Sequence, residues 1–139
     1  MLVTAEHDVA GATLAAEKVV ETHRRLVEFL RAGQTLAQVD AFVGSTLTDL
    51  DSVSAFKNYR VRGHPPFPSE ACLSVNECIV HGTHDMTSTP IAPGDLLSID
   101  IGVKHDGWIG DAAWTYVIED TDEVSMNLVI AGRESLRLG

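Results

Sequence analysis

Basic residues are scarce in this sequence, and their scarcity narrows the classes of partner. Lysine and arginine together number 10, against 20 aspartates and glutamates, which gives a formal net charge of −10. Because phosphate binding needs a basic surface, we expect no nucleic-acid partner. An acidic chain of this kind is compatible with a cation-binding site, and equally with solubility alone.

Cysteines and long apolar runs are scarce too. The two cysteines, Cys72 and Cys78, form neither a CxxC pair nor a disulfide framework, so we expect a reducing, cytoplasmic location. No apolar run approaches the roughly 18–20 residues that span a bilayer, and the N-terminus lacks the basic and apolar regions of a signal peptide. The sequence therefore predicts a cytoplasmic protein with no membrane partner.

Apolar residues are present in ordinary proportion, at 45% of the 139 residues, so a single globular domain over 1–139 is expected. Their three- and four-residue spacing predicts helices over about 4–32, 35–50 and 124–138. Thr4 is placed to cap the first helix, and Thr35 with Gln38 resembles a capping box at the start of the second. We interpret these helices as scaffold.

The middle of the chain has strand and loop patterns. Residues 71–76 alternate apolar and polar side chains as a half-buried strand does, and residues 54–56 are typical of a strand start. The segment 64–68 contains three prolines and must be a loop. Phe67 in that loop suits the wall of a pocket, but a simple connection explains the loop equally well.

His81 and Gly82 follow a short apolar piece over residues 77–80. We expect this piece to be a buried strand, with the histidine at its end. An imidazole in such a position can act as a proton donor, and a glycine allows another backbone to approach closely. A lone His-Gly pair is weak support for such a role.

Two apolar runs joined by Asp106-Gly107 form the most informative stretch. Asp-Gly between apolar runs is a strong hairpin signal. If the two residues form the whole loop, Asp100 pairs with Ala113, and Asp111 pairs with Gly102. The two aspartates then share one face of the sheet as diagonal neighbours, with Cβ atoms roughly 6–8 Å apart.

Two carboxylates at that separation repel each other unless a cation lies between them. Divalent ions roughly 3.5–4 Å apart would satisfy both side chains. Two alternatives stay open at this point. A different loop length would shift the register and move the aspartates to opposite faces, and aspartates near hairpins are often solvated surface groups.

Several segments in their order resemble the type I methionine aminopeptidases. They are Ser74-Val75-Asn76-Glu77, Val80-His81-Gly82, Pro93-Gly94-Asp95, Ser98-Ile99-Asp100-Ile101 and Gly107-Trp108-Ile109-Gly110-Asp111-Ala112. The resemblance covers essentially the whole chain, but only the first of the two halves of that family's pita-bread fold. It implies an α+β fold in which helices pack on one face of an antiparallel sheet.

The resemblance also assigns roles to single residues. Asp100 and Asp111 match two ligands of a dinuclear metal site, and His81 matches the catalytic histidine that contacts the substrate. The remaining matches are to positions that bind the substrate's methionine side chain: Cys72, Phe67 and His64. His64 stands where the family often has an aromatic residue.

The family's other three ligands, a histidine and two glutamates, have no match in this chain. The implied cofactor is a pair of divalent ions, with cobalt, manganese, iron and zinc not distinguished, and the site is incomplete. We therefore expect a metal-dependent aminopeptidase type of protein that removes N-terminal methionine from peptides or nascent chains. The alternatives are a non-catalytic half module, which binds peptide N-termini or joins a second copy or a complementary half chain, and an inactive structural fragment.

Overall fold

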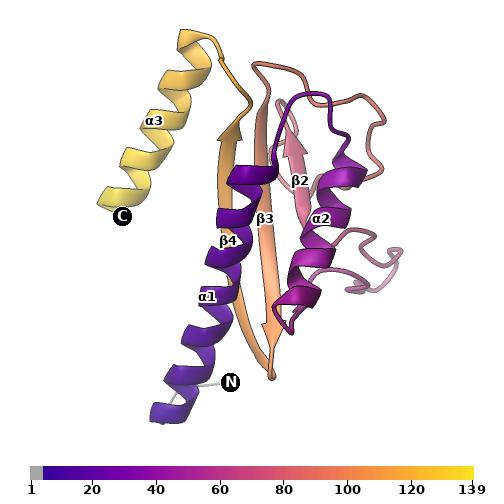
Figure 1. The fold of residues 1–139 in the computed structure, drawn as a ribbon, viewed down its shortest axis with the longest axis vertical. Coiled ribbons are helices and arrows are strands. Elements are labelled where there is room, and N and C mark those ends of the chain that lie inside the picture. Colours follow the sequence, from indigo (N-terminus) through magenta and orange to yellow (C-terminus); the bar gives the residue numbers. More distant parts are fainter. Residues whose placement is uncertain (1–4) are drawn as a thin grey trace.

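A four-stranded antiparallel sheet with helices on one face forms the body of the chain, in a computed structural model that describes residues 5–139 (Figure 1). The elements, in chain order, are α1 (Glu6–Phe29), α2 (Leu36–Asp49), β1 (Val53–Ser54), β2 (Cys72–Val75), β3 (Leu96–His105), β4 (Trp108–Val117) and α3 (Glu123–Leu138). The central strand is β3, which pairs with β1 and β2 along one edge and with β4 along the other. The expected α+β fold class is confirmed.

Helix α1 ends at Phe29, three residues before the predicted end, because Gln34 caps it. The Gln34 side chain accepts a hydrogen bond from the Arg31 N–H (2.8 Å) and donates one to the Phe29 carbonyl (3.1 Å). At the other end, Thr4 lies outside the described residues. The capping box of α2 is confirmed, since Gln38 N–H donates to Thr35 Oγ1 (3.3 Å) and Thr35 N–H donates to Gln38 Oε1 (2.8 Å).

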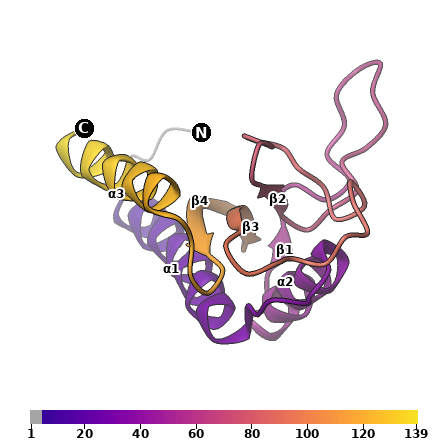
Figure 2. The same cartoon turned by 90° about the horizontal axis from the view of Figure 1, so that it is seen from above.

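The core lies between the sheet and the first two helices (Figure 2). Alternate residues of β3 point toward the helices and are fully buried: Leu97, Ile99, Ile101 and Val103. Helix α1 approaches β4 very closely, because a Cβ on Gly110 would lie 2.6 Å from the Ala15 carbonyl oxygen. The helices thus cover one face of the hairpin and leave its other face free.

Residues 77–80 correct one expectation. They form a turn instead of a buried strand, and Ile79 is 84% exposed. Strand β2 ends at Val75 because Asn76 takes a positive φ of 51° and the Cys78 N–H closes a turn onto the Val75 carbonyl. His81 therefore leaves a turn, with its own φ at 59°, and does not follow a strand.

Helix α3 has few contacts with the rest of the chain (Figure 1). Only Val129 is buried in it, while its other large apolar side chains are exposed: Val124, Met126, Leu128, Ile130, Leu136 and Leu138. One contact reaches β4, where the Arg133 guanidinium lies 5.2 Å from the Trp114 ring centroid. Nothing in residues 5–139 is a helix long and apolar enough to cross a membrane.

His23 links α1 to β4. Its Nε2 lies 3.0 Å from the Ala112 carbonyl, and its Nδ1 lies 2.8 Å from the Tyr116 hydroxyl. A carbonyl only accepts, so Nε2 carries the proton, and Nδ1 of the neutral ring accepts from the hydroxyl. Burial is the main cause that lowers the pKa of His23, and the hydrogen bond to Ala112 acts in the opposite direction.

This geometry predicts acid destabilisation. Below a pH of about 6.5 the unfolded chain binds a proton at His23 that the folded chain resists, so stability falls as pH decreases toward the lower folded-state pKa. Urea denaturation between pH 8 and 5 should show this loss, and His23→Gln should reduce it. His64→Gln, at an exposed histidine outside the α1–β4 contact, is the matched control and should keep the loss. An identical profile for His23→Gln and the wild type would contradict the prediction.

Candidate metal centre

The hairpin adopts the predicted register. Asp106 and Gly107 form a two-residue loop, and their φ values of 47° and 85° are those of a type I′ turn. Asp100 consequently pairs with Ala113, and Asp111 with Gly102. The two aspartates lie on the same face of the sheet, as the sequence predicted.

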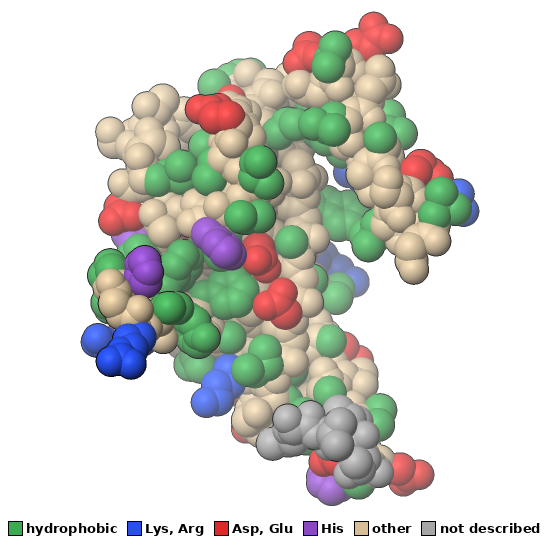
Figure 3. Space-filling view, turned by 180° about the vertical axis from the view of Figure 1, so that it is seen from behind, with side chains coloured by type: hydrophobic (Ala, Val, Ile, Leu, Met, Phe, Trp, Pro, Cys, Tyr) green, Lys and Arg blue, Asp and Glu red, His purple; other side chains and the backbone are tan. Residues whose placement is uncertain are grey.

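That face is the one without helices. Asp100 is half-buried and Asp111 is exposed. Figure 3 views this side of the molecule and shows acidic and histidine side chains gathered near its centre among hydrophobic ones. Burial is the main cause that raises the pKa of Asp100, and the neighbouring Asp111 carboxylate raises it further. The site therefore disfavours a second negative charge unless a cation compensates it.

One oxygen of this pair has no partner. Asp100 Oδ1 is buried and is the only such side-chain atom without a hydrogen-bond partner in the described part of the chain. An unpaired buried acceptor costs about 1–3 kcal/mol, and a divalent ion would satisfy it with the hard oxygen ligand that such ions prefer. The donors present fit a cation, but residues 5–139 contain no group of three or more potential ligands arranged to hold one.

Cys72 and His81 lie beside the aspartates. Cys72 is opposite Asp100 in the β2–β3 register. Burial, with added repulsion from Asp100 and Asp111, raises the pKa of the Cys72 thiol to about 11, although a hydrogen bond from the His81 backbone acts against it. A charged His81 ring lowers the pKa of Asp100. The structure thus brings together four of the six predicted site residues: Cys72, His81, Asp100 and Asp111.

The Cys72 thiol should be inert in the folded chain, because its buried sulfur stays protonated near neutral pH. Iodoacetamide at pH 8 should modify the partly exposed Cys78 first, and peptide mass spectrometry should find Cys72 labelled only after denaturation. Faster labelling of Cys72 than of Cys78 in the native protein would show that its surroundings have been misjudged.

Phe67 reaches the site through a second aromatic ring. It makes an edge-to-face contact with Phe56, with ring centroids 6.4 Å apart. Phe56 in turn covers Gly102, where a Cβ would lie 2.4 Å from the ring, and Gly102 is the register partner of Asp111. The Phe56–Phe67 pair therefore forms an apolar wall beside the aspartates, and a glycine inside a strand is the sequence signal for such a close approach.

His64 is not brought to this group. It is exposed in the loop between β1 and β2, where its N–H donates to the Val61 carbonyl (3.0 Å). This loop projects from the body in Figure 2. Within residues 5–139, no side-chain hydrogen bond or ring contact joins His64 to Cys72, Phe67 or the aspartates.

Sequence reasoning missed a polar cluster behind the site. Buried Asp40 of α2 accepts from the N–H groups of Glu70 (2.8 Å) and Ala71 (3.3 Å), just before Cys72. His84 Nδ1 lies 3.7 Å from Asp40 and 2.9 Å from the hydroxyl of buried Ser69. The cluster joins α2 to the two segments that carry Cys72 and His81. Its members are far apart in the sequence, so no local pattern could reveal it.

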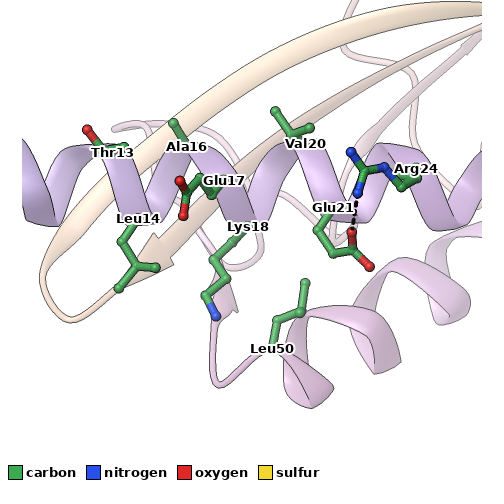
Figure 4. A pocket seen from close by; sticks show the side chains of 9 residues that line it. All are labelled: Thr13, Leu14, Ala16, Glu17, Lys18, Val20, Glu21, Arg24 and Leu50. Carbon is green, nitrogen blue, oxygen red and sulfur yellow. Dashed lines mark hydrogen bonds and ion pairs between the residues drawn. The ribbon is translucent and has the colours of Figure 1, made fainter.

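One surface groove does not belong to this site. A groove of about 460 Å³ lies along α1 near Leu50 (Figure 4), on the helix side of the sheet and away from the aspartate face. Two of the polar side chains that line it, Glu21 and Arg24, form the ion pair of 3.4 Å drawn there. We assign the site from the carboxylate geometry and not from this groove.

The fold and the paired aspartates define a class of protein, the half pita-bread unit with two carboxylates on its sheet. Residues 11–137 match the model of metallopeptidase family M24. The chain belongs to this family.

Named relatives agree with the assignment. The chain is 32% identical over 125 residues to methionine aminopeptidase 1 of Bacillus subtilis, covering 90% of this chain and 48% of the relative. It is 34% identical over 129 residues to methionine aminopeptidase 1 of Mycobacterium tuberculosis, covering 92% and 46%. The chain therefore spans about half the length of the curated relatives it matches.

Solved structures give the same result. The methionine aminopeptidase of Thermotoga maritima superposes with a TM-score of 0.87 at 30% identity, covering 99% of this chain and 53% of that one. That of Rickettsia prowazekii gives a TM-score of 0.89 at 23% identity, which supports the fold alone. The expected half of a pita-bread fold is confirmed.

Proposed function

We propose that residues 1–139 form one domain that supplies half of a metal-dependent aminopeptidase site acting on N-terminal methionine of peptides or nascent chains. The observation that carries the proposal is the buried, unpartnered Asp100 Oδ1 beside the Asp111 carboxylate. The names of the similar proteins support the substrate class. The free cysteines suit a cytoplasmic location.

Each residue of the group has a role in this proposal. Asp100 and Asp111 would hold divalent ions, whose identity among cobalt, manganese, iron and zinc is open. When bound, such ions polarise a carbonyl and acidify water. His81 would donate a hydrogen bond to the substrate, and Cys72 with Phe67 would line the space for a methionine side chain.

Two carboxylates hold a transition-metal ion weakly, since catalytic zinc sites have about three protein ligands and oxygen-only sites about six donors. We therefore expect weak binding of Mn²⁺ or Co²⁺ by the isolated chain, and hydrolysis of a Met-Gly peptide that is slow or undetectable. Any metal binding and any hydrolysis should disappear in Asp100→Asn and Asp111→Asn. Hydrolysis that persists unchanged in both variants would refute the proposal, as would a wild-type chain with no measurable cation affinity.

A second candidate function is a non-catalytic half module that associates with a second copy or with a complementary half chain. The observation that favours it is surface that the described residues leave uncovered: the aspartate face, the outer edge of β4 and the exposed apolar side chains of α3. Exposed apolar surface of this extent commonly marks an interaction site.

A further inference from the structure

The loop between β1 and β2 concentrates positive charge in an otherwise acidic chain. Residues 57–64 contain three of the ten lysines and arginines and no acidic residue. Lys57 is neutralised by an ion pair with Glu70. Arg60 and Arg62 are exposed, and in the described part of the chain neither forms an ion pair or a side-chain hydrogen bond. Two uncompensated cations therefore lie close together on a chain whose formal net charge is −10.

Hydrogen bonds tie this loop to the wall of the candidate site. The Asn58 N–H donates to the Phe67 carbonyl (2.9 Å), and the Phe67 N–H donates to the Tyr59 carbonyl (2.9 Å). These two bonds hold the base of the loop together at the aromatic wall described above. The arginines follow this base directly along the chain, so the wall and the cations belong to one hydrogen-bonded unit.

The loop projects on the aspartate side of the sheet. Figure 2 shows it extending away from α1 and α2, and in Figure 3, which views the aspartate face, basic side chains lie at the left edge and acidic ones nearer the centre. The Cα atoms of Arg60 and Arg62 are at most about 4 and 11 Å from that of Tyr59, since consecutive Cα atoms are about 3.8 Å apart. An extended peptide advances about 3.3 Å per residue. A peptide whose first residue lies beside Phe67 therefore has its third to fifth residues within reach of the arginines.

We propose that Arg60 and Arg62 select substrates that carry acidic side chains a few residues after the N-terminal methionine. The proposal rests on the function proposed above, which places the methionine beside Phe67, and it adds the class of peptide. An arginine can bind a carboxylate through two parallel hydrogen bonds. Tyr59 and Val61 alternate with the arginines and are 65% and 54% exposed, so they offer apolar contact to the same segment.

An acidic peptide fits this surface better than a nucleic acid does. Tight phosphate binding needs many cations, because each neutralised phosphate adds to the affinity, and this loop offers two uncompensated arginines. The chain as a whole is acidic and repels a long polyanion. A short acidic segment that is anchored by its methionine needs only local attraction, which the two arginines supply.

Peptide binding to the metal-free protein tests the proposal without any turnover. Fluorescence anisotropy of labelled Met-Gly-Ser-Glu-Glu-Ala and Met-Gly-Ser-Gln-Gln-Ala should give a Kd roughly fivefold lower for the glutamate peptide at low salt, and less difference at high salt. The double variant Arg60→Gln, Arg62→Gln should remove the difference. The double variant Arg24→Gln, Arg31→Gln makes the same charge change at exposed arginines in and just after α1 and should keep it.

Three results would overturn the proposal. The first is an equal Kd of the two peptides for the wild type, and the second is a difference that survives Arg60→Gln, Arg62→Gln. The third is a preference that persists when the glutamates are moved beyond the tenth position, because it would show attraction without registration from the methionine. A single-stranded oligonucleotide that binds the loop more tightly than the glutamate peptide would also contradict it and would assign the arginines to nucleic acid.

Acetylation of the peptide N-terminus separates this proposal from the proposed function. The paired aspartates attract a free α-ammonium group, so acetylation should weaken the binding of both peptides. If acetylation has no effect, the proposed function fails, and the placement of the acidic segment after a bound methionine fails with it. If acetylation weakens binding but the glutamate preference is absent, the proposed function stands and only the selection by Arg60 and Arg62 is refuted.

Discussion

Replacing Asp100 with asparagine is expected to stabilise the metal-free chain by about 1 kcal/mol, because a charged carboxylate buried without a partner costs more than a neutral amide in the same place. The variant removes a desolvated charge that also repels Asp111. Its new amide group can donate a hydrogen bond to the Asp111 carboxylate. Urea denaturation in EDTA measures the change. A residue placed in the metal site thus lowers stability in the absence of metal.

The same variant should abolish stabilisation by cations. At ten times its dissociation constant, Mn²⁺ should stabilise the wild type by about 1.4 kcal/mol, and Asp100→Asn should show almost none of this gain. Asp120→Asn, at an exposed aspartate, makes the same charge change as a control and should keep the cation response. If Asp100→Asn destabilised the metal-free chain as a typical buried substitution does, the interpretation of Asp100 as strained by its charge would be wrong.

Replacing Gly82 with alanine should have the largest effect on stability. A Cβ there would lie 2.1 Å from the Leu73 carbonyl oxygen, a backbone atom that cannot move without shifting β2. The change would also disturb two hydrogen bonds, from Leu73 N–H to Gly82 (2.8 Å) and from Gly82 N–H to Ser74 (3.1 Å). We expect a loss at or above the upper end of the 1–3 kcal/mol that overpacking commonly costs, measured by urea denaturation.

Gly132→Ala provides the matched control for Gly82→Ala. Gly132 lies within α3 with no atom near its Cβ position, so alanine should stabilise the helix by about 0.5–1 kcal/mol. The two substitutions are chemically identical and should have opposite signs. A small effect of Gly82→Ala would mean that the loop carrying His81 is not held against β2.

Local chemistry made the hairpin predictable from the sequence. Asp106-Gly107 is a turn with one strongly preferred geometry, and that geometry fixes which residues of β3 and β4 face each other. The placement of Asp100 and Asp111 on one face followed directly. The helices were predictable for a similar reason, since their apolar spacing and the Thr35–Gln38 cap are local patterns.

The parts that could not be predicted depend on distant contacts. The end of α1 depends on the side chain of Gln34. The segment 77–80 was predicted as a buried strand because it is apolar, but Ile79 and Val80 are exposed in a turn. The cluster of Asp40 and His84 joins residues 44 positions apart in the chain, so only the fold reveals it. Asp100 Oδ1 is buried without a hydrogen-bond partner, and this is why the site favours a cation. Its burial depends on how distant residues pack around it, so the sequence alone does not reveal it.

Helix α3 should be the first element to open. A 16-residue helix with Val129 as its only buried side chain depends mainly on its own hydrogen bonds and on the Asp122 cap, and isolated helices of this length are only marginally stable in water. Trypsin should therefore cut after Arg133 and Arg137 before it cuts the sheet. The ordering of α3 is then coupled to whatever surface covers it, and part of any binding energy would be consumed in folding this helix.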